Sequence, residues 1–347
     1  MSARQVESRI TVAHPRETST LSGHCEAEAA LLSAYRSGRI PHAWLIGGAQ
    51  GIGKATLAYR MARFVLAHRN PLAAHVQGAS TLSVDPSDPV ARQVAANSHG
   101  SLLTLERSLN DRGVLRTVIT VDETRETISF FGSTAAVDGW RVCIVDTVEE
   151  LNPNAANALL KVLEEPPQQS LFLLISNAPA RALPTILSRC RKLMLRPLAI
   201  PDVISAAATA ANISAEDPAL GDAAEASEGS VSRALTLLGG DAIKLHQQTT
   251  ALLSTLPRVD PRELHALGDA ISGSDRGALS AFIDSIDRWI SQRLRADDNA
   301  NANLPRLARL AEVWEKINSA ARDTESYNLE RKPLVFSVFG LLAEAMQ

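Results

Sequence analysis

The chain has 347 residues, of which 45% are hydrophobic, and its formal net charge is −3. This length predicts two or three domains with apolar cores, and the charge excludes a protein that binds polyanions through its overall composition. The three cysteines form no C-x-x-C pair, so a zinc or redox centre of that type is not expected. No apolar run is long enough to span a membrane, and residues 1–16 are polar, so we expect a cytoplasmic protein.

The first hundred residues combine one strand pattern with two helix patterns. Residues 1–20 lack periodicity and are expected to form a flexible arm, and residues 26–35 are expected to form a short helix. Residues 43–46 predict a buried strand, and residues 55–67 a helix. The segment 68–100 mixes proline, serine, aspartate and glycine, so it is either a surface insertion or partly disordered.

Four further apolar runs follow, with helix patterns between them. We expect strands at residues 117–121, 141–146, 171–175 and 192–195, and helices from residue 122 onward and at 157–165. Short apolar strands that alternate with helices predict a parallel sheet with helices on both faces. This α/β domain is expected to end at Leu198.

The remainder of the chain has no strand pattern. Residues 201–241 are rich in alanine and predict three short helices, and Gly239-Gly240 predicts a joint. Beyond it, apolar residues recur at intervals of three and four, which predicts amphipathic helices separated by a polar loop at 296–303.

The segment from Gly48 to Lys54 follows the pattern G-x-x-x-x-G-K between a predicted strand and a predicted helix. Gly48, Gly51 and Gly53 let backbone N–H groups curl around a phosphate, and the helix that starts here directs its positive end toward it. The lysine would cap the outer phosphates of a nucleotide such as ATP. A glycine-rich turn without a ligand is the alternative, and the strand–helix context favours the phosphate loop.

The groups that would act on the nucleotide are incomplete. A serine or threonine hydroxyl that holds Mg²⁺ belongs directly after the lysine, but Ala55 stands there, and Thr56 lies about 100° further around the helix. Asp146 is placed to steady a metal, whereas Thr147 replaces the glutamate that polarises water in many ATPases with this kind of sheet. Two acids further along are less well aimed: Glu149 and Glu150. We therefore expect a site that binds ATP without hydrolysing it efficiently, with Mg²⁺ weak or absent.

Three further segments share their sequence with one known family. Residues 157–167 read N-A-L-L-K-V-L-E-E-P-P, residues 184–190 read P-T-I-L-S-R-C, and residues 228–235 read E-G-S-V-S-R-A-L. In content, order and interval they resemble bacterial clamp-loader subunits of the AAA+ class, from about residue 15 to residue 245. The resemblance implies a P-loop AAA+ domain at 21–198, a three-helix lid at 199–241 and an all-α oligomerisation collar at 242–347.

One feature departs from the family. Its members usually carry a four-cysteine zinc module after the phosphate-loop helix, and the corresponding segment here, residues 68–100, has no cysteine. His68, His75 and His99 are too far apart in sequence to replace it, so we predict no zinc.

The resemblance also implies roles for single residues. Arg189 resembles an arginine finger that enters the ATP site of an adjacent subunit, where a guanidinium stabilises charge on the transferring phosphate; a surface arginine is the alternative. Arg233 resembles the lid arginine that senses nucleotide, and a helix-surface charge is equally compatible. Ser176 or Asn177 resembles a polar sensor that orients water, with simple capping as the alternative. Residues 178–198 hold five basic residues and no acid, and this face meets DNA phosphates, an acidic neighbour or only solvent.

We therefore expect a clamp-loader subunit that does not hydrolyse ATP efficiently by itself. Its implied partners are ATPase subunits, a clamp-opening subunit, the sliding clamp and, through the assembly, primed DNA. Three alternatives stay open: an ATP-hydrolysing member of the same loader, a free-standing phosphate-loop kinase, and a scaffold that binds no nucleotide. Ala55 and Thr147 argue against the first, and the sequence offers no acceptor pocket for the second.

Overall fold

The structure is a computed structural model that describes residues 13–108, 116, 118–132, 139–238, 242–273, 276–296, 304–327 and 329–346. Contacts between residues divide the chain into two compact units, one of them Thr11–Ala234 and the other holding Leu235–Gln347. Most of the expected flexible arm, residues 1–12, lies outside the described residues.

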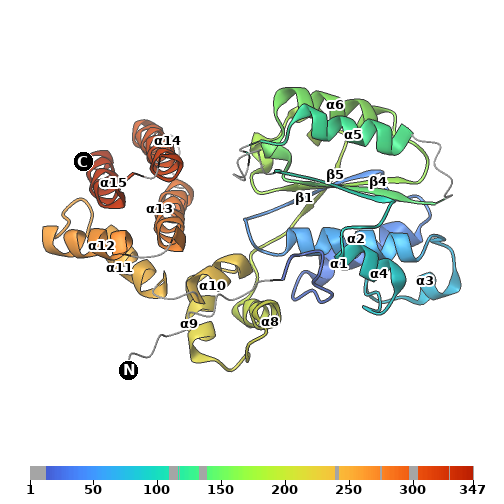
Figure 1. Ribbon diagram of the computed structural model, residues 1–347, viewed down its shortest axis with the longest axis horizontal. Helices are drawn as coiled ribbons and strands as arrows, with labels where there is room; N and C mark the ends of the chain where they lie inside the picture. Colours follow the sequence, from blue (N-terminus) through green and yellow to red (C-terminus); the bar gives the residue numbers. More distant parts are fainter. Residues whose placement is uncertain are drawn as a thin grey trace. The chain divides into compact units, whose positions relative to one another are not determined.

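The first unit is built on a five-stranded parallel sheet (Figure 1). Its strands are β1 (Ala43–Gly47), β2 (Leu102–Glu106), β3 (Arg141–Asp146), β4 (Ser170–Ser176) and β5 (Arg191–Met194). They lie in the order β2-β3-β4-β1-β5, so β1 pairs with both β4 and β5. The prediction of a parallel α/β sheet is confirmed.

Helices cover both faces of this sheet (Figure 1). One face carries α1 (Cys25–Arg36), α2 (Lys54–Ala67), α3 (Ala74–Gly78) and α4 (Pro89–Ala95), and the other carries α5 (Val121–Gly132) and α6 (Pro153–Glu164). Successive residues of a strand point to opposite faces. Accordingly, Trp44 and Ile46 of β1 join the core beneath α1 and α2, while Ala43 and Leu45 join the core beneath α5 and α6.

The strand expected at residues 117–121 is wrong. Within its described part, only Ile119 pairs with another strand-like residue, in an isolated parallel bridge to Leu151. The missing strand is β2, which forms the edge of the sheet beside β3. The β-branched residues at 117–121 have a strand preference, but the neighbouring chain offers them one partner position and no ladder.

The segment after α2 forms an ordered part of the first unit. Arg36 of α1 donates through Nε to the Val76 carbonyl oxygen at 2.9 Å. The Leu82 N–H donates to Glu28 Oε1 at 3.0 Å, and the same oxygen accepts from Arg60 Nη2 at 2.7 Å. A buried ion pair therefore joins α1, α2 and this surface insertion.

Three helices follow the sheet: α8 (Ile200–Ala211), α9 (Pro218–Ala226) and α10 (Val231–Leu238). The sequence predicts three short helices between residues 201 and 241, and we refer to α8, α9 and α10 below as the lid. Asp217 caps α9 by accepting from the Ala219 N–H, and Asn212, in the left-handed region with φ 53°, ends α8. α10 crosses the boundary between the two units.

The second unit is helical throughout its described part. It comprises α11 (Ala242–Ser254), α12 (Pro261–Gly273), α13 (Arg276–Ala296), α14 (Leu304–Ser326) and α15 (Arg331–Ala345). Its core gathers Phe282, Ile286, Ile317, Val335 and Phe339, each nearly inaccessible to solvent. The predicted polar loop at 296–303 lies almost wholly outside the described residues. Among the helices that the structure describes, none is long and apolar enough to cross a membrane.

Candidate nucleotide site and candidate arginine finger

The predicted phosphate loop links the carboxyl end of β1 to the first residue of α2. Three of its glycines have positive φ angles: Gly48 at 149°, Gly51 at 76° and Gly53 at 101°. A side chain is strained in this region of backbone conformation. At Gly48, a Cβ atom would also lie 2.7 Å from the Leu195 carbonyl oxygen. The glycine spacing seen in the sequence is therefore required by the shape of the loop.

Lys54 is 4% exposed and directs its ammonium group back onto the loop. Its Nζ donates to the carbonyl oxygens of Gly48 at 2.9 Å and Ala49 at 2.5 Å. Burial lowers the pKa of Lys54 to about 8, although the nearby carboxylates of Asp146 and Glu149 raise it. An ammonium has three N–H donors, so one remains for a ligand held in the loop.

The acid at the end of β3 lies in the electrostatic field of this lysine. Burial raises the pKa of Asp146 to about 6, and Lys54 acts in the opposite direction. Ala55 follows Lys54 in the first turn of α2, and no hydroxyl group stands at that position. Thr56 is half-buried on the next position of the helix. The site thus holds a cation and an acid but lacks the hydroxyl ligand for Mg²⁺.

Glu149 connects the end of β3 with the end of β4. Its Oε1 accepts from the backbone N–H groups of Asn177 at 2.5 Å and Ala178 at 2.9 Å. Glu150 points elsewhere, toward Arg107 at 2.9 Å. Glu149 thus supports the backbone after β4, and Glu150 forms an ion pair with Arg107.

Three buried oxygen atoms at these strand ends have no hydrogen-bond partner in the described part of the chain. They are Thr147 Oγ1, Glu149 Oε2 and Ser176 Oγ. Buried polar atoms without partners are rare and usually mark a place for a polar ligand or solvent. Simple capping by the Ser176 side chain, one of the two readings of the sequence, is therefore not observed.

The lid closes directly over the phosphate loop. Ser230 Oγ donates to the Gln50 carbonyl oxygen at 2.9 Å, and the Val231 N–H donates to the Gly51 carbonyl oxygen at 2.8 Å. A Cβ atom on Gly51 would overlap the hydroxyl oxygens of Ser230 and Ser232. His24 also contacts the loop, with its Nε2 atom 2.7 Å from the Ile52 carbonyl oxygen. The loop is thus held by its own lysine, by α10 and by the residue before α1.

Arg233, the predicted lid sensor, lies on α10 and is 7% exposed. It is therefore not a helix-surface charge, which corrects that alternative reading of the sequence. Its backbone N–H lies 3.4 Å from Ser230 Oγ, so it belongs to the same turn that contacts the phosphate loop.

Arg189 lies in a different place, between α7 (Pro184–Leu187) and β5. Its Nη2 donates to Glu164 Oε1 at 2.6 Å, and its Nη1 donates to the Thr185 carbonyl oxygen at 2.8 Å. The Arg189 side chain is 34% exposed. The sequence indicates a role for Arg189 but not its contact with Glu164, the last residue of α6.

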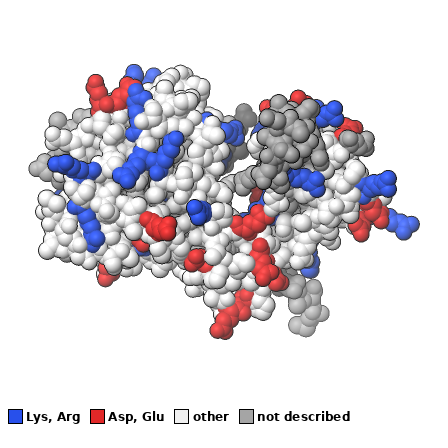
Figure 2. All heavy atoms as spheres, turned by 180° about the vertical axis from the view of Figure 1, so that it is seen from behind, with Lys and Arg blue, Asp and Glu red and all other residues white. Residues whose placement is uncertain are grey.

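The basic stretch around Arg189 is mostly at the surface. Its other basic residues are exposed: Arg181, Arg191, Lys192 and Arg196. The Arg191 guanidinium lies over the Trp44 ring, 5.1 Å from its centroid, so this arginine has a packing role. Figure 2 shows lysine and arginine side chains over the sheet-containing unit and acidic side chains gathered over the lid.

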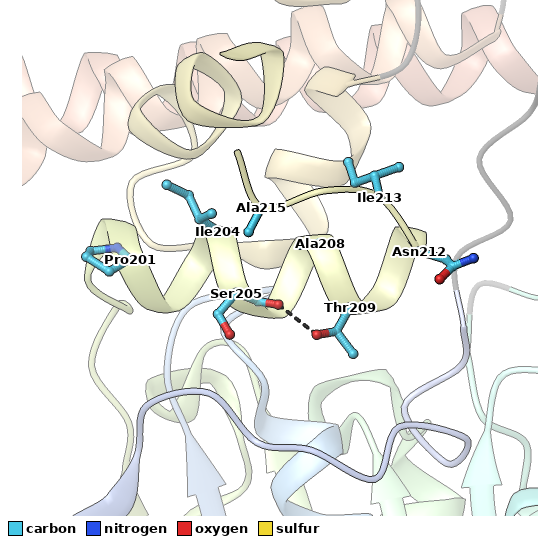
Figure 3. A pocket seen from close by; sticks show the side chains of 8 residues that line it. All are labelled: Pro201, Ile204, Ser205, Ala208, Thr209, Asn212, Ile213 and Ala215. Atoms are coloured by element: carbon cyan, nitrogen blue, oxygen red, sulfur yellow. Dashed lines mark hydrogen bonds between the residues drawn. The ribbon is translucent and has the colours of Figure 1, made fainter. Parts of the chain in front are cut away.

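Two features lie away from the phosphate loop: a pair of histidines and a pocket along α8. Within the described residues, no three histidine, cysteine or acidic side chains are grouped so that they could hold a metal ion. His68 and His75 do approach each other, with ring centroids 5.0 Å apart. A pocket along α8, between Pro201 and Ala215, is lined by small, apolar and uncharged polar side chains, and the Thr209 hydroxyl donates to the Ser205 carbonyl oxygen (Figure 3). It offers no charged group to a ligand.

Comparison with known proteins identifies relatives of the sheet domain. The family model described as "DNA polymerase III, delta subunit" matches residues 23–199, just over half of the chain. A DNA polymerase III subunit delta' from Pseudomonas aeruginosa is 39% identical over 149 residues, which cover 43% of this chain and 41% of that protein. The Escherichia coli (strain K12) DNA polymerase III subunit delta' is 32% identical over 216 residues, 61% of this chain and 58% of that protein.

More distant relatives cover a larger part of the chain. The DNA polymerase III subunit tau of Escherichia coli (strain K12) is 28% identical over 250 residues, 70% of this chain and 36% of that protein. Among solved structures, a DNA polymerase III gamma subunit-related protein from Thermotoga maritima is similar with a TM-score of 0.43 and 16% identity, covering 91% of this chain and 99% of that chain. The matched segments thus span about half the length of the two delta' relatives.

Proposed function

The chain belongs to the family of DNA polymerase III delta subunits, and from this premise we propose that it is a delta-prime-type subunit of a clamp loader. In this proposal it does not hydrolyse ATP efficiently and supplies Arg189 to the nucleotide of a neighbouring ATPase subunit. Loading of a sliding clamp onto primed DNA is then the work of the whole assembly.

The composition of the phosphate site supports weak or absent hydrolysis. Ala55 offers no oxygen to Mg²⁺, and Thr147 offers no carboxylate to an attacking water. Glu149, the first acid after Thr147 in the chain, already accepts two backbone hydrogen bonds. Positioning of metal and water accounts for most of phosphoryl-transfer catalysis, so a site without these groups is a poor hydrolase.

The same site retains features that fit a triphosphate. The Lys54 ammonium keeps one N–H donor beyond its two bonds to the loop, and Gly48, Gly51 and Gly53 hold the loop in a conformation that suits phosphate binding. Bound phosphate would add negative charge to that of the nearby Asp146 and Glu149 carboxylates, which already favour the charged form of this buried lysine. We infer that the loop and Lys54 would hold the phosphates of ATP, with Arg233 on the lid side. The Asp146 carboxylate repels phosphate, so it would contribute only through a bound Mg²⁺ ion.

The position of Arg189 carries the proposal that it acts on another subunit. The phosphate loop starts after Gly47, at the carboxyl end of β1, and Gly47 is level with Met194 at the end of β5. Arg189 precedes Arg191, which begins β5 and is level with Trp44. The two sites are separated by at least three residues of strand, about 10 Å. Arg189 is therefore at the opposite end of the sheet from its own phosphate loop, at a half-exposed position suited to a neighbouring molecule.

The implied partners follow from the family alone. They are ATPase subunits, a clamp-opening subunit and the sliding clamp, and primed DNA reaches the protein through the assembly. The division into an AAA+ domain at 21–198, a lid at 199–241 and an oligomerisation collar at 242–347 belongs to the same proposal. The apolar core of α11 to α15 supports an independently packed helical collar.

The arginine-finger role is tested in a reconstituted loader. Arg189→Ala should leave assembly intact and lower DNA-stimulated ATP turnover by on the order of a hundredfold or more at the site it serves. Arg181→Ala is the matched control, because Arg181 is an exposed arginine of the same basic stretch. Equal turnover in the two variants would show that Arg189 is only a surface arginine.

The hydrolysis proposal is tested on the isolated chain. ATP binding and ATP turnover are measured for the native protein and for Lys54→Ala, which removes the buried ammonium. We expect the native chain to turn over no more ATP than the variant. Turnover that depends on Lys54 would identify the chain as an ATP-hydrolysing member of the loader instead.

A further inference from the structure

The guanidinium of Arg189 is held from two directions by its own subunit. Glu164 Oε1 accepts from Nη2 at 2.6 Å, and Nη1 donates to the Thr185 carbonyl oxygen at 2.8 Å and approaches Ser188 Oγ at 3.4 Å. These contacts use at most three of the five N–H donors of an arginine. At least two donors stay available to the phosphate oxygens of a partner.

The end of α6 fixes the carboxylate that makes the first of these contacts. Leu163, one residue earlier, is 1% exposed and belongs to the core between the sheet and α5 and α6. The last turn of α6 therefore cannot rotate freely. The Glu164 side chain that follows is 51% exposed. The rigid helix thus delivers a carboxylate to the surface beside α7 at a defined place.

Neither the helix dipole nor folding stability explains a glutamate at position 164. An acidic side chain at the C-terminal end of a helix lies near the negative end of the helix dipole, which disfavours it. A half-exposed ion pair contributes little to folding stability. What the pair does provide is direction, because a long arginine side chain otherwise samples many rotamers.

We propose that Glu164 is a positioning residue, which holds the Arg189 guanidinium in the orientation that a neighbouring subunit's nucleotide requires. This inference rests on the proposed function of Arg189. It adds that the finger is oriented before the subunits meet, so that less rotamer entropy is lost when it engages the phosphates.

The contact itself is tested first, on the isolated full-length chain and independently of any ATPase activity. Glyoxal modification of Arg189 is followed by mass spectrometry in the native protein, in Glu164→Ala and in Glu165→Ala. Glu165 is the adjacent exposed acid, so its variant makes the same change in net charge. We expect faster modification only in Glu164→Ala, and equal rates in all three proteins would overturn the inference.

Positioning is tested in the reconstituted loader by the kcat and KM of DNA-stimulated ATP turnover. Glu164→Ala should lower kcat by on the order of tenfold with KM nearly unchanged, because a misplaced group costs rate rather than binding. Glu164→Gln keeps an oxygen acceptor and should restore part of the rate, and Glu165→Ala should match the native protein. In the Arg189→Ala background, Glu164→Ala should have no further effect, since it acts only through the arginine.

The outcomes separate the two proposals. If Arg189→Ala leaves turnover unchanged, the proposed function fails and the positioning role fails with it. If Arg189→Ala lowers turnover but Glu164→Ala does not, or raises it, only the positioning role is overturned. The same holds if Glu164→Ala lowers turnover equally with and without Arg189.

Discussion

Ser230 Oγ donates to the Gln50 carbonyl oxygen at 2.9 Å, and this bond joins residues 180 positions apart in the chain. It places the first turn of α10 on the phosphate loop, where the Val231 N–H also donates to Gly51. The carbonyl groups of the loop are therefore satisfied by the lid as well as by Lys54. A change in the backbone of the loop would therefore alter the position of the lid, because hydrogen bonds join the two.

The first prediction concerns Gly51→Ala. The added Cβ would overlap the hydroxyl groups of Ser230 and Ser232, and the backbone at this glycine has a φ of 76°, which strains an alanine. We expect a loss of about 1–3 kcal/mol in the free energy of unfolding, measured by urea titration. We also expect faster hydrogen exchange of the α10 backbone, because the substitution weakens the hydrogen bonds from Ser230 and Val231 to the loop.

Gly221→Ala is the matched control for this change. Gly221 lies within α9, and a Cβ atom there would meet no other atom within 4 Å. Because alanine is the better helix former, this variant should be stabilised by about 0.5–1 kcal/mol. A Gly51→Ala protein as stable as Gly221→Ala, with unchanged exchange in α10, would contradict the described contact.

The second prediction concerns the buried ion pair between Glu28 and Arg60. Glu28 Oε1 accepts from two nitrogens of Arg60 and from the Leu82 N–H, and both side chains are nearly buried. Glu28→Ala leaves a buried guanidinium without this carboxylate and should cost about 3–5 kcal/mol in the free energy of unfolding. Limited proteolysis should also cut residues 68–100 sooner, because Leu82 loses its anchor.

Glu26→Ala serves as the control for that experiment. Glu26 lies in the first turn of the same helix and is exposed. Its removal should change the unfolding free energy by less than about 0.5–1 kcal/mol, the scale of an exposed charge near a helix N-terminus. Similar proteolysis of both variants would mean that Glu28 does not anchor the insertion.

Two of the predicted strands, β1 and β4, are buried on both faces, whereas β5, which was also predicted, is an exposed edge strand. β1 and β4 read as continuous apolar runs because every residue in them is buried. β2, the other edge strand, was missed although it contains three leucines; its residues are mostly half-buried, and the β-branched run at 117–121 was predicted in its place. The β-branched run at 117–121 looked stronger, yet only tertiary pairing decides which run joins the sheet.

The candidate site could be predicted where a local pattern carries the chemistry, as in Gly48 to Lys54. Two contacts could not be predicted: the hydrogen bond from α10 to Gly51 and the ion pair of Glu164 with Arg189. Each joins residues that are far apart in sequence. Nothing in the residues around Ser230 or Glu164 indicates which loop or arginine they face. Burial of Arg233 was equally hidden, since a helix pattern gives the face of a residue but not what covers it.

The third prediction is a pH dependence of stability that comes from Asp146. Burial raises the pKa of this carboxyl to about 6 in the folded state, above the ordinary value of 3.8. The folded state therefore binds the proton more tightly than the unfolded state, and this group makes the protein less stable as pH rises from about 4 to about 6. Asp146→Asn does not titrate, so it should be more stable than the native protein above pH 6 by about 2–3 kcal/mol and equally stable near pH 4.

Urea titrations of both proteins at several pH values check this prediction. Asp122→Asn is the control. The Asp122 side chain lies in α5 and is 83% exposed, so this substitution makes the same chemical change at the surface. It should show no such difference across this range. The prediction fails if the difference in the free energy of unfolding between the native protein and Asp146→Asn is the same at every pH. That result would show that the Asp146 carboxyl is not held in the buried environment described here.

The last prediction tests the missing Mg²⁺ ligand by restoring it. Ala55→Ser places a hydroxyl directly after Lys54, in the first turn of α2, where it can reach a cation beside the phosphates. ATP affinity of the isolated chain should then rise with Mg²⁺ by about tenfold or more, the scale of one charge-assisted contact, whereas the native chain should show little dependence on Mg²⁺.

Thr56→Ser is the control, since it alters a hydroxyl side chain one position away that points about 100° further around the helix. Turnover should stay low in Ala55→Ser, because Thr147 still provides no carboxylate to activate water. An Ala55→Ser chain with no Mg²⁺-dependent gain in affinity would mean that something other than this hydroxyl keeps the metal from the site.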